Sequence, residues 1–278
     1  MIKLGSHTPF KAPNYLVDSA KFSIENGANT MMIYLGPPQN SKRISTNKYK
    51  YEEYLTKYSE LIKPKDIIVH APYIINPSNL EKYEFAIDYL IDECQRMNFI
   101  GAKYLVLHPG SYTKYNLENS LNCLIKSLNL VLNKTKDVTI CIETMSGKGT
   151  EVGINLEQIH YILQQVNNER LQICLDTCHI WDAGYDLKEY DVFKNKLKSL
   201  DLLKHIKVIH LNDSKNDLGS HKDRHENIGE GFIGINTLAK FVHDKDFDNI
   251  PIILETPYKD HGHIYNQEIN ELLNYKNN

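Results

Sequence analysis

The sequence predicts a (β/α)8 TIM barrel of the α/β class, with an active site at the carboxyl-terminal rim of the strands. Eight short runs rich in β-branched residues recur along the chain, and apolar residues at helical spacing lie between most of them. This alternation implies parallel strands joined by helical crossovers, and eight such units favour a closed barrel over an open sheet. The chain of 278 residues has an ordinary length for this fold.

The expected strands, in order, cover residues 2–4, 30–35, 67–69, 104–107, 138–142, 171–175, 206–209 and 250–254. Helical spacing is clearest after the third strand, at Tyr83, Ile87, Leu90 and Cys94, and after the fourth strand, from Leu121 to Val131. Residues 36–46 and 213–234 are expected to be long loops, which are often functional in compact domains. The stretch 49–58 is expected on the solvated surface. No linker-like composition divides the chain, so we expect one domain spanning residues 1–278.

Composition restricts the cellular setting. No apolar run is long enough to cross a bilayer, and the amino-terminal residues lack the pattern of a signal peptide. The five cysteines form no CxxC pair, which fits a reducing compartment, so we expect a cytoplasmic protein with no membrane partner. The formal net charge of -3 argues weakly against a general nucleic-acid binder, whose surface is normally basic.

Six consecutive strands end in a residue that can bind a metal ion: His70, His108, Glu143, Asp176, His210 and Glu255. Successive members are 38, 35, 33, 34 and 45 residues apart, about one strand plus one helix each. Their side chains are therefore expected at the same rim of the barrel, where barrel active sites lie. A single such residue is more often a helix cap or a partner for a loop. Recurrence on six strands favours a shared metal site.

Local spacing adds three further candidate ligands. Asp176 and His179 lie three residues apart, which places them on one side of a first helical turn or of a tight bend leaving the strand. Asp223 and His225 point the same way if the segment between them is extended, whereas Arg224 points elsewhere. The nine candidates provide five imidazoles, four carboxylates and no thiolate, a set that suits zinc best, with manganese or iron as substitutes. Nine ligands for two or three ions imply at least one bridging carboxylate.

These residues carry a resemblance to the endonuclease IV family of apurinic/apyrimidinic endonucleases, and the resemblance spans essentially the whole chain. Its motifs are Glu143-Thr144 followed by Gly147, LDTCH at 175–179, LNDSK at 211–215, and the segment through Gly219-Ser220 and 223–225 to GEG at 229–231. The resemblance implies three zinc ions per chain. His70 and His108 would bind one zinc, His179, Asp223 and His225 another, and Asp176, His210 and Glu255 the third. Glu143 would bridge two of them.

The resemblance also implies an activity. The expected reaction is hydrolysis of the phosphodiester 5′ to an abasic site, leaving a 3′-hydroxyl, together with cleaning of blocked 3′ ends. Glu143 would be catalytic by orienting or deprotonating the attacking water. The expected partner is double-stranded DNA with abasic sites or blocked 3′ ends, bound by a monomer. Three Zn²⁺ would change the formal charge from -3 to +3 by adding six positive charges at the rim.

Reaching a phosphate from the bottom of a rim pocket requires taking the damaged nucleotide out of the helix. Tyr73 and Ile74 are expected to wedge into the base stack, the alternative being that they cover the barrel mouth. Gln39 lies where some family members insert an arginine, which is a departure from the family pattern. Lys215, Ser220 and Arg224 are expected to contact phosphates, although Arg224 could instead brace a ligand carboxylate.

Two other functions remain open from the sequence. Sugar isomerases and epimerases of the related barrel superfamily also place Glu, Asp and His on successive strands around one or two metal ions. They would not need His70, His108, His179, Asp223 and His225 together, so the third metal discriminates between the two functions. The other alternative is a noncatalytic protein that binds damaged DNA. All nine ligand positions are filled, which argues against it.

Overall fold

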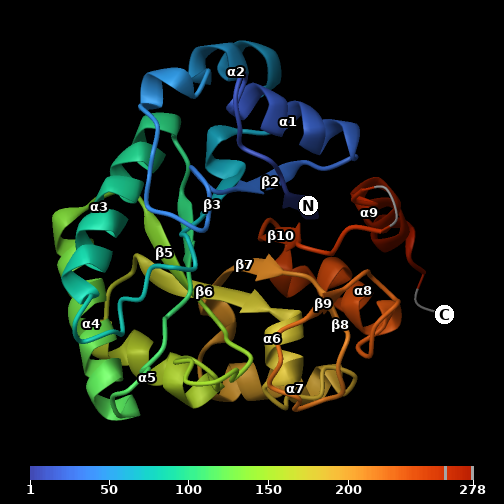
Figure 1. The fold of residues 1–278 in the computed structure, drawn as a ribbon. Coiled ribbons are helices and arrows are strands. Elements are labelled where there is room, and N and C mark those ends of the chain that lie inside the picture. The colour runs from blue at the N-terminus through green and yellow to red at the C-terminus, as the bar shows by residue number, and fades with distance from the viewer. Residues whose placement is uncertain (260–261, 277–278) are drawn as a thin grey trace.

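The computed structural model describes residues 1–259 and 262–276, and a closed parallel barrel lies at its centre (Figure 1). The barrel strands in these residues are β1 (Lys3–His7), β2 (Thr30–Ile33), β3 (Ile67–His70), β4 (Tyr104–Leu107), β5 (Thr139–Glu143), β6 (Leu171–Asp176), β7 (Ile206–His210) and β10 (Pro251–Leu254). They close in the order β1-β10-β7-β6-β5-β4-β3-β2, and every neighbouring pair is parallel. The predicted fold class is confirmed, and β1 extends further than expected.

Helices surround the strands, as Figure 1 shows. They are α1 (Leu16–Glu25), α2 (Tyr51–Tyr58), α3 (Tyr83–Ile100), α4 (Leu117–Lys134), α5 (Leu156–Val166), α6 (Thr177–Asp182), α7 (Tyr190–Ser199), α8 (Ile235–His243) and α9 (Tyr265–Asn274). Short 3-10 turns η1 (Thr46–Lys48), η2 (Pro64–Asp66), η3 (Leu203–His205) and η4 (Lys245–Phe247) complete the connections. None of the described helices is both long enough and apolar enough to span a bilayer.

Side-chain caps fix where the helices after β4 and β5 begin. The side chain of Asn116 accepts a hydrogen bond from the backbone N–H of Asn119 at the start of α4. Asn155 caps α5 in the same way through the N–H of Gln158. Each asparagine satisfies a backbone donor that the first helical turn leaves unpaired. The caps therefore define how much chain remains as loop between each strand end and the next helix.

Apolar side chains fill the interior of the barrel. One layer of fully buried apolar side chains lies inside the barrel, and it is formed by Met32, Ile68, Val106, Cys141, Cys174, Val208 and Ile253. These residues come from seven of the barrel strands and lie below the strand ends. A second and larger apolar core separates the strands from the helices. The polar residues at the strand ends therefore lie on an apolar layer that excludes water, as in other barrels whose interior is packed with side chains.

The expectation that residues 49–58 lie on the solvated surface is wrong for Tyr49 and Tyr54, whereas the other residues of the stretch are exposed or half-buried. Tyr49 and Tyr54 are fully buried, and Tyr54 lies in α2. The hydroxyl of Tyr54 donates to the carbonyl of Ile62, and the hydroxyl of Tyr49 accepts a hydrogen bond of 3.1 Å from Arg96. A buried tyrosine needs only one partner for its hydroxyl, so these rings pack with the core despite the polar character of the segment.

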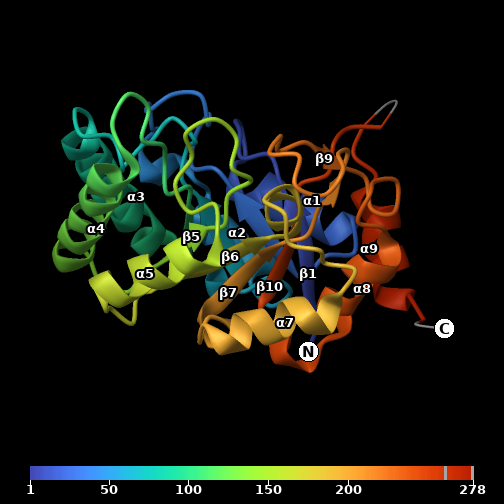
Figure 2. The same ribbon diagram turned by 90° about the horizontal axis from the view of Figure 1, so that it is seen from below.

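The long connections lie at the carboxyl ends of the strands. In Figure 2 they gather on one side of the molecule, together with β9, while the amino terminus lies on the opposite side. The connection of residues 213–234 contains a two-stranded antiparallel pair, β8 (Asp213–Ser214) and β9 (His225–Glu226), and is otherwise irregular. Residues 36–45 contain no helix or strand. Both predicted loops are therefore present at the rim.

Candidate metal centre

The nine predicted ligands meet at the carboxyl-terminal rim. His70, Glu143, Asp176 and His210 are the last residues of β3, β5, β6 and β7. His108 and Glu255 directly follow β4 and β10. His179 lies in the first turn of α6, Asp223 in the loop that follows β8, and His225 in β9. Ligands from the ends of six barrel strands, from α6, from the loop after β8 and from β9 thus converge on one place.

Glu143 occupies the middle of this cluster. Its Oε2 lies 3.2 Å from Nε2 of His70 and 3.1 Å from Nε2 of His108. Its Oε1 lies 3.0 Å from Nδ1 of His210 and 3.4 Å from Nδ1 of His179. The side chain is only 1% exposed. Each carboxylate oxygen therefore faces a different set of imidazoles, which is the arrangement that a carboxylate bridging two metal ions requires.

Asp223 and Asp176 connect the other ligands. Oδ1 of Asp223 lies 3.0 Å from Nε2 of His179 and 3.6 Å from Nε2 of His225. Oδ2 of Asp176 lies 3.8 Å from both Nε2 of His225 and Nδ1 of His210. The residues form three groups in which the potential ligand atoms all lie within 4.8 Å of one another. These are His70, Glu143 and His210; Asp176, His179 and His225; and Glu143, Asp176, His210 and Glu255.

The histidine hydrogen bonds fit metal binding. Nδ1 of His70, His179 and His225 lies 2.6, 2.8 and 3.2 Å from the backbone carbonyls of Ala71, Thr144 and Glu255, respectively. A carbonyl can only accept, so each Nδ1 carries a proton and Nε2 is the ring nitrogen that faces the cluster. Metal-binding histidines are normally oriented in this way. Nε2 of His225 is buried and has no hydrogen-bond partner among the described residues, as expected for an atom that binds a metal ion.

The electrostatics of the cluster favour cations. Burial by itself would raise the pKa of Glu143, but the charges of His210 and His108 hold that pKa well below its ordinary value. Burial also opposes ionisation of Asp223, yet the hydrogen bond to His179 and the charges of His179, His225 and Lys148 together lower its pKa to about 2. Burial would lower the pKa of His179, but the charges of Asp176, Asp223 and Glu143 and the hydrogen bond to Asp223 together raise it well above its ordinary value. Metal ions and protons therefore compete for the same atoms, so metal binding would release protons.

The predictions made from local spacing, one for Asp176 with His179 and one for Asp223 with His225, have different outcomes. Asp176 caps α6, and its Oδ1 accepts a hydrogen bond of 2.7 Å from the N–H of His179, so the expected helical turn is present. The segment from Asp223 to His225 is not extended throughout, because Asp223 has a φ of 56°. The carboxylate of Asp182 holds this turn by accepting the N–H of Asp223 at 2.8 Å. The two ligands converge through a left-handed turn and not through strand alternation.

The predicted DNA-contacting residues lie in loops that follow strands. Gln39 is exposed in the loop after β2, and Tyr73 and Ile74 after β3 are 52% and 42% exposed. Nζ of Lys215 lies 3.7 Å from the Glu226 carboxylate, and Ser220 has a buried hydroxyl oxygen that lacks a partner among the described residues. Arg224 is exposed and makes no ion pair within residues 1–259 and 262–276, so the structure gives no sign that it braces a ligand carboxylate.

Lys148 was missed by the sequence analysis. It lines a cavity of about 300 Å³ beside the cluster together with Tyr73, Asn76, His108, Ser111 and Glu151. Its positive charge contributes to the lowered pKa of Asp223. The available signal was its place between Gly147 and Gly149, shortly after the strand that ends in Glu143. The lysine places positive charge at the mouth of the metal centre.

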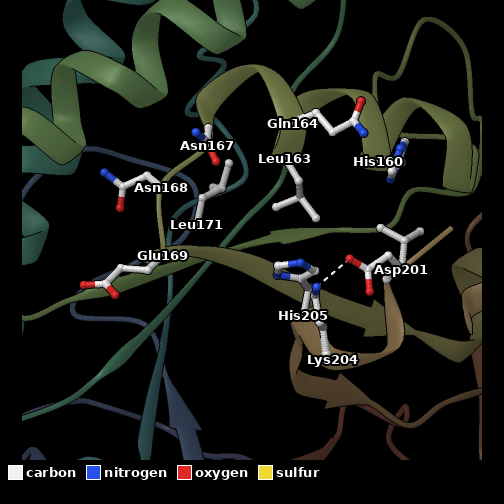
Figure 3. A pocket seen from close by; sticks show the side chains of 11 residues that line it. His160, Leu163, Gln164, Asn167, Asn168, Glu169, Leu171, Asp201, Lys204 and His205 are labelled. Atoms are coloured by element: carbon white, nitrogen blue, oxygen red, sulfur yellow. Dashed lines mark ion pairs between the residues drawn. The ribbon is translucent and has the colours of Figure 1, made fainter.

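A second cavity, of about 420 Å³, lies far from the cluster. Figure 3 shows its lining, which includes His160, His205 and the ion pair between Lys204 and Asp201. It lies at the amino ends of β6 and β7, so it is at the opposite end of the barrel. In the described part of the chain, neither histidine belongs to a potential metal-binding group.

The chain is similar to known proteins over nearly its whole length. Residues 20–275 match a family model described as a xylose isomerase-like TIM barrel. Probable endonuclease 4 of Mycoplasmopsis agalactiae is 64% identical over 276 residues, which cover 99% of each chain. The same protein of Mycoplasmopsis synoviae is also 64% identical, over 99% of this chain and 100% of that protein.

Solved structures agree with these relatives. Endonuclease IV from Thermus thermophilus superposes with a TM-score of 0.84 at 25% identity and covers 98% of both chains. A D-tagatose 3-epimerase-like protein reaches a TM-score of 0.75 at 20% identity, over 98% of this chain and 97% of that one. The second likeness concerns the fold alone.

Proposed function

The chain belongs to the endonuclease IV family and is an apurinic/apyrimidinic endonuclease, and from this premise we propose that it works with three zinc ions held by the nine residues of the metal centre. The observation that carries this proposal is the position of Glu143, within 3.4 Å of nitrogen atoms from four histidines. A barrel built for one metal ion would have no use for so many imidazoles around one buried carboxylate.

The ligands are proposed to divide among the three ions as the family resemblance implies. One ion takes His70 and His108, the second takes His179, Asp223 and His225, and the third takes Asp176, His210 and Glu255. Contacts within two of the sets support this division, since His210 lies 2.9 Å from Glu255 and His179 lies 3.0 Å from Asp223. When bound, zinc supplies Lewis acidity that activates water near neutral pH and neutralises phosphate charge. Manganese or iron are proposed substitutes, because the donor set also suits them.

Glu143 is the proposed catalytic residue. Its carboxylate is buried and ionised, so an oxygen can hold the attacking water by accepting a hydrogen bond and can take its proton. The surrounding imidazoles keep the carboxylate in place, and the apolar layer below excludes bulk water from that side. The proposed products are a 3′-hydroxyl end and a 5′ end that retains the abasic residue. The same site would also clean blocked 3′ ends.

Substrate binding is proposed to use the rim loops. The exposed side chains of Tyr73 and Ile74 would enter the base stack beside the abasic site, and Gln39 would approach the same region from the loop after β2. Lys215, Ser220 and Arg224 would contact phosphates. We also propose that the protein acts as one monomeric domain in the cytoplasm.

A duplex that carries one tetrahydrofuran abasic analogue tests the proposal, because this analogue cannot be cut by β-elimination. We expect cleavage on its 5′ side that resists mild EDTA and is abolished in Glu255→Gln. Elemental analysis of protein purified without chelator should give about three zinc ions per chain. One zinc per chain would favour the isomerase function, and an intact duplex would favour a noncatalytic damage-binding protein. A duplex with a 3′-phosphate tests the cleaning of blocked ends separately.

A further inference from the structure

Asn212 lies fully buried just beyond the end of β7 and contacts two of the ligand residues. Its Nδ2 donates a hydrogen bond of 2.8 Å to Oδ2 of Asp176. Its Oδ1 accepts a hydrogen bond of 2.9 Å from the backbone N–H of Glu255. The backbone of Asn212 is held as well, since its N–H donates to the hydroxyl of Thr177, which in turn donates to its carbonyl. Neither end of this side chain is free to rotate.

The orientation of the amide follows from its partners. A backbone N–H can only donate, so the amide atom that faces Glu255 must be the oxygen. The nitrogen then faces Oδ2 of Asp176, which accepts its hydrogen bond. A flipped amide would lose both bonds, so only one orientation of the Asn212 side chain satisfies both partners.

The consequence for Asp176 is a fixed carboxylate. Its Oδ1 accepts the N–H of His179 at 2.7 Å, and its Oδ2 accepts the amide of Asn212. Each oxygen has one further lone-pair direction for a metal ion. β7 lies between β6 and β10 in the barrel, so Asn212 joins ligand residues from the strands on both sides of its own. Asp176 and Glu255 also belong to the same potential ligand group, together with His210 and Glu143.

We propose that Asn212 is a positioning residue for the metal ion held by Asp176, His210 and Glu255. It is not itself a ligand: its nitrogen orients the Asp176 carboxylate, and its oxygen fixes the backbone from which the Glu255 side chain leaves. Partners that orient metal ligands typically contribute about 10- to 100-fold to metal affinity or activity. The inference rests on the proposed function, because it assigns Asn212 to one of the three proposed zinc sites.

Truncation of Asn212 with a matched control tests the proposal. Asn227 is also a buried asparagine, and its Nδ2 donates to Oε1 of the buried Glu268 at 3.0 Å without touching a metal ligand. Zinc-loaded wild type, Asn212→Ala and Asn227→Ala are dialysed against a graded series of a zinc chelator, and the retained zinc is measured by elemental analysis. We expect Asn212→Ala to release one zinc at a free-zinc concentration about 10- to 100-fold higher than wild type. Asn227→Ala should retain zinc as wild type does.

Kinetics provide a second measurement. In Asn212→Ala, kcat on the abasic duplex should fall about 10- to 100-fold while KM stays within about twofold, and excess zinc should restore part of kcat. Asn212→Ala that releases zinc as wild type does would overturn the proposal. If that variant does not fold, Asn212→Asp keeps the volume and the acceptor for Glu255 but loses the donor to Asp176. It should show the same early release of zinc, and wild-type retention would overturn the proposal equally.

The two proposals can fail separately. Wild-type protein that holds zinc but leaves the abasic duplex intact would contradict the proposed function. The zinc release of the Asn212 variants relative to wild type would still decide whether this residue positions a metal site.

Discussion

The carboxylate of Asp182 accepts a hydrogen bond of 2.8 Å from the backbone N–H of Asp223, a residue that the structure holds at a φ of 56°. The same carboxylate accepts a hydrogen bond of 2.7 Å from the hydroxyl of Ser214. A left-handed backbone at a residue other than glycine costs about 1 kcal/mol or more, so it persists only where neighbouring groups hold it. Asp182 is thus the group that brings the side chain of Asp223 to His179.

Replacement of Asp182 should therefore weaken a metal site without removing a ligand. Asp182→Ala leaves the N–H of Asp223 without its acceptor, and we expect about 10- to 100-fold weaker binding of the zinc held by Asp223. Asp182→Asn should retain most of the affinity, because its oxygen can still accept from Asp223 while its nitrogen donates to Ser214. Chelator titration followed by elemental analysis measures both. Equal zinc retention in wild type and Asp182→Ala would show that the turn forms without Asp182.

Tyr73 is predicted to matter for DNA and not for the fold. Its side chain is 52% exposed, so Tyr73→Ala should change the free energy of unfolding by less than about 0.5 kcal/mol. Loss of a ring that stacks on a base should weaken binding of the abasic duplex roughly tenfold or more, with zinc content unchanged. Phe85 on α3 is also 52% exposed, and Phe85→Ala serves as the control. Similar binding by both variants would place Tyr73 outside the interface.

Lys148 is predicted to contribute one phosphate contact from the mouth of the metal centre. Lys148→Gln should weaken binding of DNA at low salt, and the slope of log K against log salt concentration should become shallower by about 0.9. Lys136, which precedes β5 at the opposite end of the barrel, provides the control through Lys136→Gln. Binding measured by fluorescence anisotropy at several salt concentrations gives both slopes. An unchanged slope in Lys148→Gln would exclude a phosphate contact by this residue.

The fold and the ligands at the strand ends could be predicted from the sequence. The fold follows from the spacing of apolar residues, and the ligands follow from their position at the ends of the predicted strands. His70 and His108, for example, lie at the ends of strands one βα unit apart, His108 directly after β4, and the barrel topology alone brings such residues to the same rim. The resemblance to the family then supplied the grouping of ligands and the substrate. Neither step needed knowledge of a single side-chain contact.

The features that were missed depend on contacts between residues distant in sequence. The turn at Asp223 is fixed by Asp182, which lies 41 residues earlier in the chain. Tyr49, between η1 and α2, is buried, and Arg96 of α3 provides a hydrogen-bond partner for its hydroxyl. Asn212 stands within a recognisable motif, but its role becomes visible only when Asp176 and Glu255 are seen on either side of it. Sequence periodicity contains no information on such pairs.

The buried pair of Arg43 and Glu93 anchors the loop that presents Gln39. Nε of Arg43 lies 3.2 and 3.1 Å from the two carboxylate oxygens of Glu93, and both side chains are almost fully buried. The guanidinium also donates to the carbonyl of Lys42 and lies over the ring of Tyr89. The residues before η1 are therefore fixed to α3 from within their own loop, so changes in this pair should affect both the loop and the stability of the protein.

Burial raises the pKa of Glu93 to about 7, although the charge of Arg43 lowers it. The folded state therefore binds this proton more tightly than the unfolded state, whose carboxyl has a pKa near 4.5. The stabilisation is complete below pH 4.5 and is lost as the pH rises towards 7. Between about pH 5 and pH 8, the free energy of unfolding of wild type should fall by roughly 2 kcal/mol relative to Glu93→Gln. Urea titrations at both pH values measure this difference. A rise in the free energy of unfolding of wild type relative to Glu93→Gln between the two pH values would mean that the ion pair with Arg43 outweighs burial.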